Sequence, residues 1–183
     1  TDEVTISGYA QFRDDKLVDI FDTAKDYGLN WLNNERNGQL ISFRWREQYV
    51  SLLVQNAHVH IRPEVNDQEL SFQIDAWANG YLTEDLTDED LRLQKNLHKL
   101  DEALAEQIEQ SIRRCIDKIQ RNRADSAGFG AIVHRNFPRL WEVKYKQDWG
   151  EHLQNARFNI NVRAKIERIG LTTNNITVKG EHQ

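Results

Sequence analysis

Apolar and polar residues alternate with a period of two along several segments of this 183-residue chain. Such alternation is typical of strands with one buried face and one face in water. It predicts a hairpin of two strands over residues 4–12 and 17–21, and a further strand over 40–45. Residues 22–33 fit a short helix, whereas the turn signal at 37–38 (Asn-Gly) makes a hairpin there the competing prediction. The inner side of the helix would carry Ala24, Tyr27, Trp31 and Leu32.

The middle and the end of the chain show the strand pattern more clearly. Residues 49–61 are rich in β-branched and aliphatic side chains and predict a strand that Pro63 ends. Residues 70–82 alternate strictly and predict a strand of an antiparallel sheet with one wet side. Residues 158–166 alternate as well, and their wet face is mainly basic. A last short strand is predicted at 176–178.

The longest predicted element is a helix from Thr87 to about Arg123, about 36 residues or about 54 Å long. Thr87 followed by Asp90 resembles a capping box, with negative charge where the helix dipole favours it. Apolar residues recur at intervals of three or four, forming one stripe: Leu93, Leu97, Leu100, Leu104, Ile108, Ile112, Cys115 or Ile116, and Ile119. We expect this stripe to cover the buried face of the sheet, and an overhang would leave apolar surface for a partner.

The helix is broken by Gly128-Phe129-Gly130, and a second helical stretch begins at Ala131. This stretch bends near Pro138 and continues through Trp141 towards Trp149. Together the elements predict an α+β fold, in which an antiparallel or mixed β-sheet carries a long helix and shorter helices on one face.

The composition fits a soluble globular chain, with 39% hydrophobic and 29% charged residues. No apolar run is long enough to cross a bilayer, and the residues given do not lead us to expect a signal peptide within them. The chain begins Thr-Asp-Glu-Val and contains no methionine, so we expect a processed piece of a longer protein. We divide it into a hairpin-plus-helix portion, 1–46, and a sheet-and-long-helix domain, 47–183.

The net charge of −5 is unevenly distributed. Residues 1–90 carry 18 acidic and 7 basic side chains, a balance of −11, whereas residues 91–183 carry 11 acidic and 17 basic, a balance of +6. Such asymmetry occurs in dipolar proteins and in proteins that bind nucleic acid. No basic run is interleaved with aromatic residues, so we predict no nucleic-acid partner. The residues that would carry the nucleic-acid alternative are Arg113, Arg114, Lys118, Arg121 and Arg123.

Candidate chemical groups are few. His58 and His60 lie two apart on a strand and face the same side, but nothing supplies the further ligands of a zinc site. Cys115 could pair with His134 as a nucleophile and base, yet its place on the apolar stripe indicates a buried, inert thiol. The glycines at 128 and 130 lack the pattern of a phosphate-binding loop. We therefore predict no catalytic residue, no metal and no cofactor.

An acidic cluster at 84–90 offers the one alternative with enzymatic chemistry. Helix-start signals account for the cluster, which lacks the spacing and the central glycine of a calcium loop. A pair of carboxylates such as Asp85 and Asp88 would be needed for the alternative function, a hydrolase of cortex or another polysaccharide.

A distinctive combination of residues occupies 127–135, then Pro138-Arg139-Leu140-Trp141, then Trp149. It resembles a signature of the spore germinant-receptor C subunits, the Ger(x)C-type lipoproteins of spore-forming bacteria. Residues 8–18, 28–32 and 158–171 are similar to other parts of the C-terminal region of that family. The resemblance thus covers nearly the whole chain in order.

The resemblance implies a non-enzymatic subunit that is required for spore germination in response to nutrients. The C subunit of this family is held by a lipid anchor on the outer face of the spore inner membrane, where it works with two membrane partners, the A and B subunits. The lipid-bearing cysteine of such lipoproteins lies at the mature N-terminus, whereas Cys115 lies in the middle of a helix. The lipid anchor is therefore expected in a part that is missing from this sequence.

We expect contact with the partner subunits to involve the signature and the basic wet face of the last long strand. The candidate contact residues are Gly128, Phe129, Gly130, His134, Arg135, Pro138, Trp141, Trp149, Arg157, Arg163 and Lys165. Packing in the core, or simple solvation, is the competing explanation for each of them.

Overall fold

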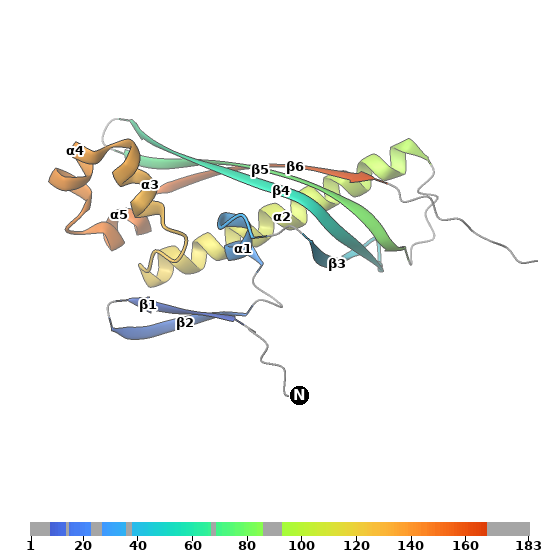
Figure 1. Cartoon of the computed structure of the whole chain (residues 1–183), viewed down its shortest axis with the longest axis horizontal. Helices are drawn as coiled ribbons and strands as arrows, with labels where there is room; N and C mark the ends of the chain where they lie inside the picture. The colour runs from blue at the N-terminus through green and yellow to red at the C-terminus, as the bar shows by residue number, and fades with distance from the viewer. Residues whose placement is uncertain are drawn as a thin grey trace, which may run out of the picture.

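A computed structural model describes residues 8–13, 15–22, 27–35, 38–66, 69–85 and 93–167, and Figure 1 shows their arrangement. The elements in chain order are β1 (Gly8–Arg13), β2 (Lys16–Asp22), α1 (Gly28–Leu32), β3 (Gln39–Trp45), β4 (Gln48–Asn66), β5 (Glu69–Asp85), α2 (Gln94–Asn122), α3 (Phe129–Asn136), α4 (Pro138–Leu140), the π-helical turn η1 (Trp141–Tyr145), α5 (Trp149–Asn155) and β6 (Arg157–Glu167). The strand predicted at 176–178 lies outside the described residues.

The main sheet has four strands in the order β3-β4-β5-β6. The pairs β3–β4 and β4–β5 are antiparallel, whereas β6 runs parallel to β5. A parallel neighbour requires a crossover connection, which α2 to α5 provide. The α+β class and the mixed sheet are thereby confirmed.

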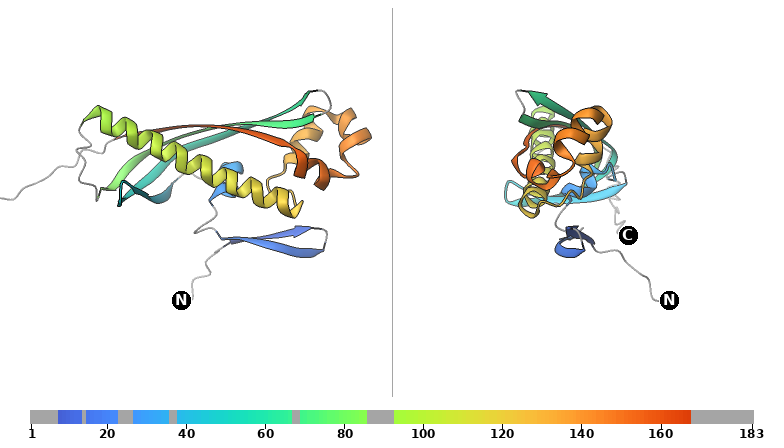
Figure 2. Two further views of the ribbon diagram at one scale, coloured as in Figure 1. Left: turned by 180° about the vertical axis from the view of Figure 1, so that it is seen from behind. Right: turned by 90° about the vertical axis from the view of Figure 1, so that its left-hand side faces the viewer.

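The long helix α2 lies beside β6 and runs in the opposite direction (Figure 2). Asp101 near its start accepts a hydrogen bond from the backbone N–H of Ile166, with N and Oδ1 2.7 Å apart. Gln120 near its end donates to the carbonyl oxygen of Ala156 at 2.9 Å. Both ends of β6 are therefore held by α2, which shields an edge of the sheet that would otherwise be open.

The core lies between one face of the sheet and the apolar stripe of α2. Phe72 and Ile74 of β5 are fully buried there, as are Leu52 of β4 and Leu104 and Ile112 of α2. The predicted stripe is thus confirmed from Leu100 to Ile119, while Leu93 at its start is exposed. Among the described elements, no helix covers the opposite face of the sheet (Figures 1 and 2).

The start of α2 differs from the prediction. Leu93 has an extended backbone, so the helix begins at Gln94 and no side chain caps it. Thr87 and Asp90, the expected capping box, lie outside the described residues. Among the described members of the stripe, Leu93 is exposed, Leu97 is partly buried, and Leu100 is the first that is fully buried.

Strand β4 continues through Pro63 to Asn66, so the prediction that Pro63 ends the strand is wrong. Proline is tolerated because β3 pairs with β4 only as far as Val54. Beyond Val54, the edge of β4 that faces away from β5 has no neighbouring strand among the described residues. The Asn34 side chain bonds to both the N–H and the C=O of Val59, so these groups point away from β5. Backbone direction alternates along a strand, so Pro63, four residues on, has its missing N–H on the same open edge.

Strands β1 and β2 form the predicted hairpin, which packs on the end of α2. Gln11 is buried and donates from Nε2 to the Ala124 carbonyl at 2.9 Å, while Asn122 donates to its Oε1 at 2.7 Å. Phe21 supplies the buried apolar contact. A polar network, with a single large apolar anchor, therefore attaches the hairpin.

Residues 28–32 are helical, which confirms the helix rather than a hairpin before Gly38, although α1 is shorter than expected. A tight turn at Arg46 and Glu47, which both have positive φ, joins β3 to β4. The suggested division after residue 46 falls inside this turn. As a domain division it stays a prediction.

Candidate functional site

The predicted contact residues lie in two regions of the molecule. We call the first the helical corner, residues 125–153, which contains α3, α4, η1 and most of α5 and lies at one end of the sheet (Figure 1). We call the second the open face, the uncovered side of β3, β4, β5 and β6.

Asp125 organises the helical corner. Its carboxylate accepts hydrogen bonds from the backbone N–H groups of Phe129 at 2.9 Å and Gly130 at 2.7 Å. It also accepts one from the indole Nε1 of Trp149 at 3.0 Å. One side chain thus holds the start of α3 and the start of α5 together.

Backbone conformation accounts for Gly128, and close packing accounts for Gly130. Gly128 has a φ of +73°, in the left-handed region that favours glycine. A Cβ atom on Gly130 would lie 3.0 Å from ring atoms of both Trp141 and Trp149. The two indole rings themselves lie 5.2 Å apart, measured between centroids.

Phe129 points into the core, where its ring lies 4.9 Å from that of Phe72 and 5.1 Å from that of Phe158. His134 and Arg135 are exposed on α3, and Pro138 begins α4. Arg135 also lines a groove of about 540 Å³ between α3 and β4. Within the corner, therefore, the exposed candidates are His134, Arg135 and Pro138, whereas the glycines, Phe129 and the two tryptophans build its interior.

On the open face, strand pairing aligns side chains in rows across the sheet. Trp77 of β5 is opposite His58 of β4 on one side and Arg163 of β6 on the other. The indole of Trp77 is 44% exposed. Tryptophan and arginine are both enriched among the residues that dominate binding energy at protein interfaces.

Further exposed apolar side chains lie on the same side of the sheet, farther along towards β3. Leu40 pairs with Leu53, and Leu53 pairs with Tyr81 in the next strand. Leu40, Leu53 and the neighbouring Tyr49 are exposed. Single exposed apolar side chains are ordinary on a protein surface. Here four large ones, Trp77 and these three, share one side of one sheet.

Most charges on the open face are already paired. Arg62 contacts Asp75 at 2.6 Å, and Arg157 contacts Glu69 at 3.1 Å. Lys165 reaches the buried Asp101 at 2.9 Å, so this candidate also holds β6 to α2. Among the described residues, no carboxylate pairs with Arg163, which leaves its guanidinium available next to Trp77.

Asp75 is the carboxylate at the centre of this face. A hydrogen bond from Asn161, at 3.2 Å, is the largest of the effects that lower its pKa, and Gln73 and Arg62 act in the same direction. Asp75 therefore stays ionised and fixes its neighbours in place.

Among the described residues, the structure does not bring Cys115 and His134 together and offers no further metal ligands beside His58 and His60. His58 and His60 share the exposed side of β4, as predicted, and no described cluster of three His, Cys, Asp or Glu side chains could hold a metal. Cys115 is buried on α2, while His134 is exposed on α3. Asp88 and the side chain of Asp85 lie outside what the structure describes.

The residues of the nucleic-acid alternative also have other contacts. Arg113 pairs with Glu109 on α2 at 2.9 Å. Lys118 pairs with Asp19 at 3.2 Å and helps to hold the hairpin.

No described helix is both long enough and apolar enough to cross a membrane.

Two important residues escaped the sequence analysis. Trp77 lies between Ala76 and Ala78, which are buried, so strict alternation would have placed it on the wet face. Asp125 was overlooked, although an aspartate shortly before a helix is a local start signal; of its three donors, only Trp149 is distant, 24 positions away.

Comparison with known proteins agrees with this α+β architecture. A crystal structure of the GerBC protein superposes with a TM-score of 0.72 at 21% identity, over 82% of this chain and 47% of the other. The family described as "Spore germination B3/GerAC like, C-terminal" matches residues 7–170. The chain belongs to this family.

Curated relatives from Bacillus subtilis (strain 168) carry the same domain. Spore germination protein KC is 27% identical over 152 residues, which cover 81% of this chain and 37% of the relative. Spore germination protein B3 is 22% identical over 157 residues, which cover 85% of this chain and 42% of the relative. The chain thus spans about two fifths of the length of these relatives.

Proposed function

We propose that this chain is the C-terminal region of a non-enzymatic subunit of a nutrient germinant receptor. It would be required for spore germination and act through contact with the membrane A and B subunits. In the full-length protein a lipid anchor would hold it on the outer face of the spore inner membrane. Family membership and the names of the germination relatives support the role in germination.

The single observation that favours contact over catalysis is the open face around Trp77. It combines an exposed indole, exposed leucines and Arg163, which pairs with no described carboxylate, on one side of one sheet. Protein interfaces are enriched in tryptophan, tyrosine and arginine, and a few such residues provide most of the binding energy. A sheet face of this kind suits another protein surface better than it suits a small substrate, which binds mostly in concave pockets.

The experiment is capture of the A and B subunits from detergent-solubilised spore membranes by the purified chain. We expect Trp77→Ala to reduce capture at least tenfold, the effect of removing an interface anchor. Arg163→Glu should reduce it further, because it reverses the unpaired charge. Val143→Ala is the matched control, since Val143 is equally apolar and 80% exposed but lies on η1.

Equal capture by the wild type, Trp77→Ala and Arg163→Glu would remove the open face from the proposal. The double variant Arg157→Glu/Arg163→Glu, introduced into the full-length protein in spores, then tests the whole basic strand. Normal receptor assembly with that variant would contradict contact through β6.

A further inference from the structure

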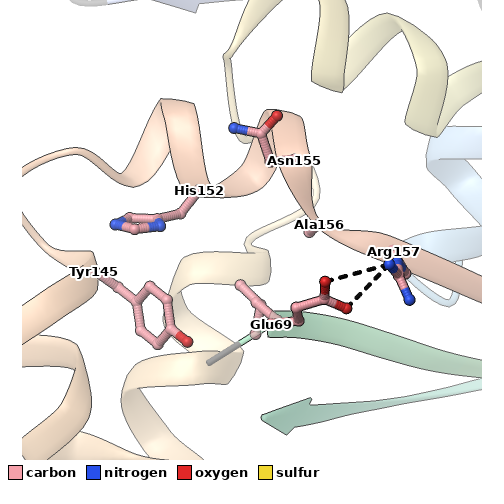
Figure 3. A pocket seen from close by; sticks show the side chains of 7 residues that line it. Glu69, Tyr145, His152, Asn155, Ala156 and Arg157 are labelled. Atoms are coloured by element: carbon pink, nitrogen blue, oxygen red, sulfur yellow. Dashed lines mark hydrogen bonds and ion pairs between the residues drawn. The ribbon is translucent and has the colours of Figure 1, made fainter. Parts of the chain in front are cut away.

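Tyr145 is fully buried, yet its hydroxyl has no hydrogen-bond partner among the described residues. A buried polar group without a partner costs about 1–3 kcal/mol, so such a group needs an explanation. The phenol forms the back wall of a pocket of about 250 Å³ between the helical corner and the start of β5. In Figure 3 the hydroxyl points across this pocket towards Glu69.

The groups around the pocket are mostly acceptors. His152 contacts the Lys144 carbonyl through Nε2 at 3.1 Å; if Nε2 carries the proton, Nδ1 presents a lone pair. Asn155 donates its Nδ2 to the Glu151 carbonyl at 3.0 Å, so its Oδ1 is not used by that bond. Glu69 adds a carboxylate, and burial raises the pKa of Tyr145, which keeps its hydroxyl neutral.

The pocket has one cationic lining group, Arg157, and its guanidinium is already bound to Glu69 (Figure 3). His152, Asn155 and Ala156 also lie at the carboxyl end of α5, where the backbone favours positive charge. An ammonium group has three N–H donors and no acceptor, which complements this set. A volume near 250 Å³ equals that of about eight water molecules, and it limits the occupant to a small molecule.

We propose that this pocket binds the ammonium group of a small organic amine, which donates to the Tyr145 hydroxyl and the Glu69 carboxylate. The site shares Arg157 with the candidate receptor contacts, but it lies at the edge of the helical corner and uses neither Trp77 nor Arg163. Entry of the amine requires the Glu69–Arg157 pair to share its carboxylate with the new cation.

The test is an NMR titration of the purified 183-residue chain with methylammonium chloride, following backbone amides from His152 to Arg157. Tetramethylammonium chloride at equal concentration is the matched probe, since it has the same charge and no N–H donor. We expect saturable shifts with methylammonium alone. Tyr145→Phe should weaken binding about tenfold and Glu69→Gln by a similar factor, as each removes one acceptor of a charged donor. Glu64→Gln, outside the pocket, is the control.

Equal responses to the two cations would overturn the proposal, as would unchanged affinity in Tyr145→Phe. Glu69→Gln replaces an exposed side chain and leaves the core intact, so it decides the question if Tyr145→Phe fails to fold. Capture of the A and B subunits is measured separately, so failure of either proposal is distinguishable from failure of the other.

Discussion

The helical corner and the open face use similar residue types in opposite ways. In the corner, Trp149 donates its indole N–H to Asp125, and its ring packs against Trp141. On the open face, Trp77 stands in a row with His58 and Arg163, and much of its indole is exposed to water. The family-like sequence signature lies in the corner, while the exposed anchor lies outside it. A distinctive sequence pattern can therefore report how a protein is built rather than where it binds.

The largest expected difference between the two regions is in stability. Phe129→Ala should lower the free energy of unfolding by about 3–5 kcal/mol, because Phe129 is fully buried between two other phenylalanines. Trp77→Ala should lower it by about 1 kcal/mol or less, because its side chain is half exposed. Urea unfolding of both variants measures the contrast. Equal losses would mean that the open face is also part of the core.

Asp125→Ala tests whether one carboxylate holds the corner together. It leaves two backbone N–H groups and an indole N–H without their acceptor, at a cost of about 3 kcal/mol. Asp125→Asn keeps one acceptor oxygen and should cost about half as much. Near-ultraviolet circular dichroism of the tryptophans reports the local change. An unchanged spectrum in Asp125→Ala would contradict the role given to this residue.

The two signature glycines should respond differently to larger side chains. Gly130→Ala should cost about 1–3 kcal/mol by overpacking against the indoles, and Gly130→Asn more. Gly128→Ala should cost about 1–2 kcal/mol through its left-handed backbone, and Gly128→Asn less, because asparagine tolerates that conformation. Thermal unfolding of the four variants gives the order. The same ranking at both positions would refute one of the two explanations.

The smallest expected effect concerns Asp75. Its folded-state pKa is lowered, so its contribution to stability is present above its ordinary pKa and is lost as the pH falls through the lowered value. Asn161→Ala should raise this pKa more than Arg62→Ala, because the bond from Asn161 is the larger cause. Carboxyl-carbon NMR titration distinguishes the two. A larger rise in Arg62→Ala would reverse the order of causes.

Local pattern predicted most of the strands and the stripe of α2, because burial on one face repeats with the period of each element. The parallel direction of β6 did not follow from its pattern, since alternation is the same for either direction. The prediction that Pro63 ends the strand was wrong because a proline ends a strand only where its missing N–H faces a neighbouring strand. Which edge of β4 is free depends on the whole sheet and cannot be predicted from the strand alone. The role of Asp101 depends on Ile166, 65 positions away, and Asp125 joins two nearby backbone donors to Trp149, which is 24 positions away. Arg163 was predicted as a contact, but Trp77 beside it was not.

The parallel pairing of β6 also has a consequence for synthesis of the chain. Asn161 contacts Asp75 from 86 positions later in the sequence, so the sheet is completed only after residues 157–167 have been made. Until then the edge of β5 has no neighbour and α2 lacks the strand that it packs against. Such late, long-range pairing slows folding and prolongs exposure of apolar surface. A nascent chain stalled before Arg157 would therefore expose the unpaired edge of β5 and would be prone to aggregate. Pairing of β6 with β5 would remove this tendency.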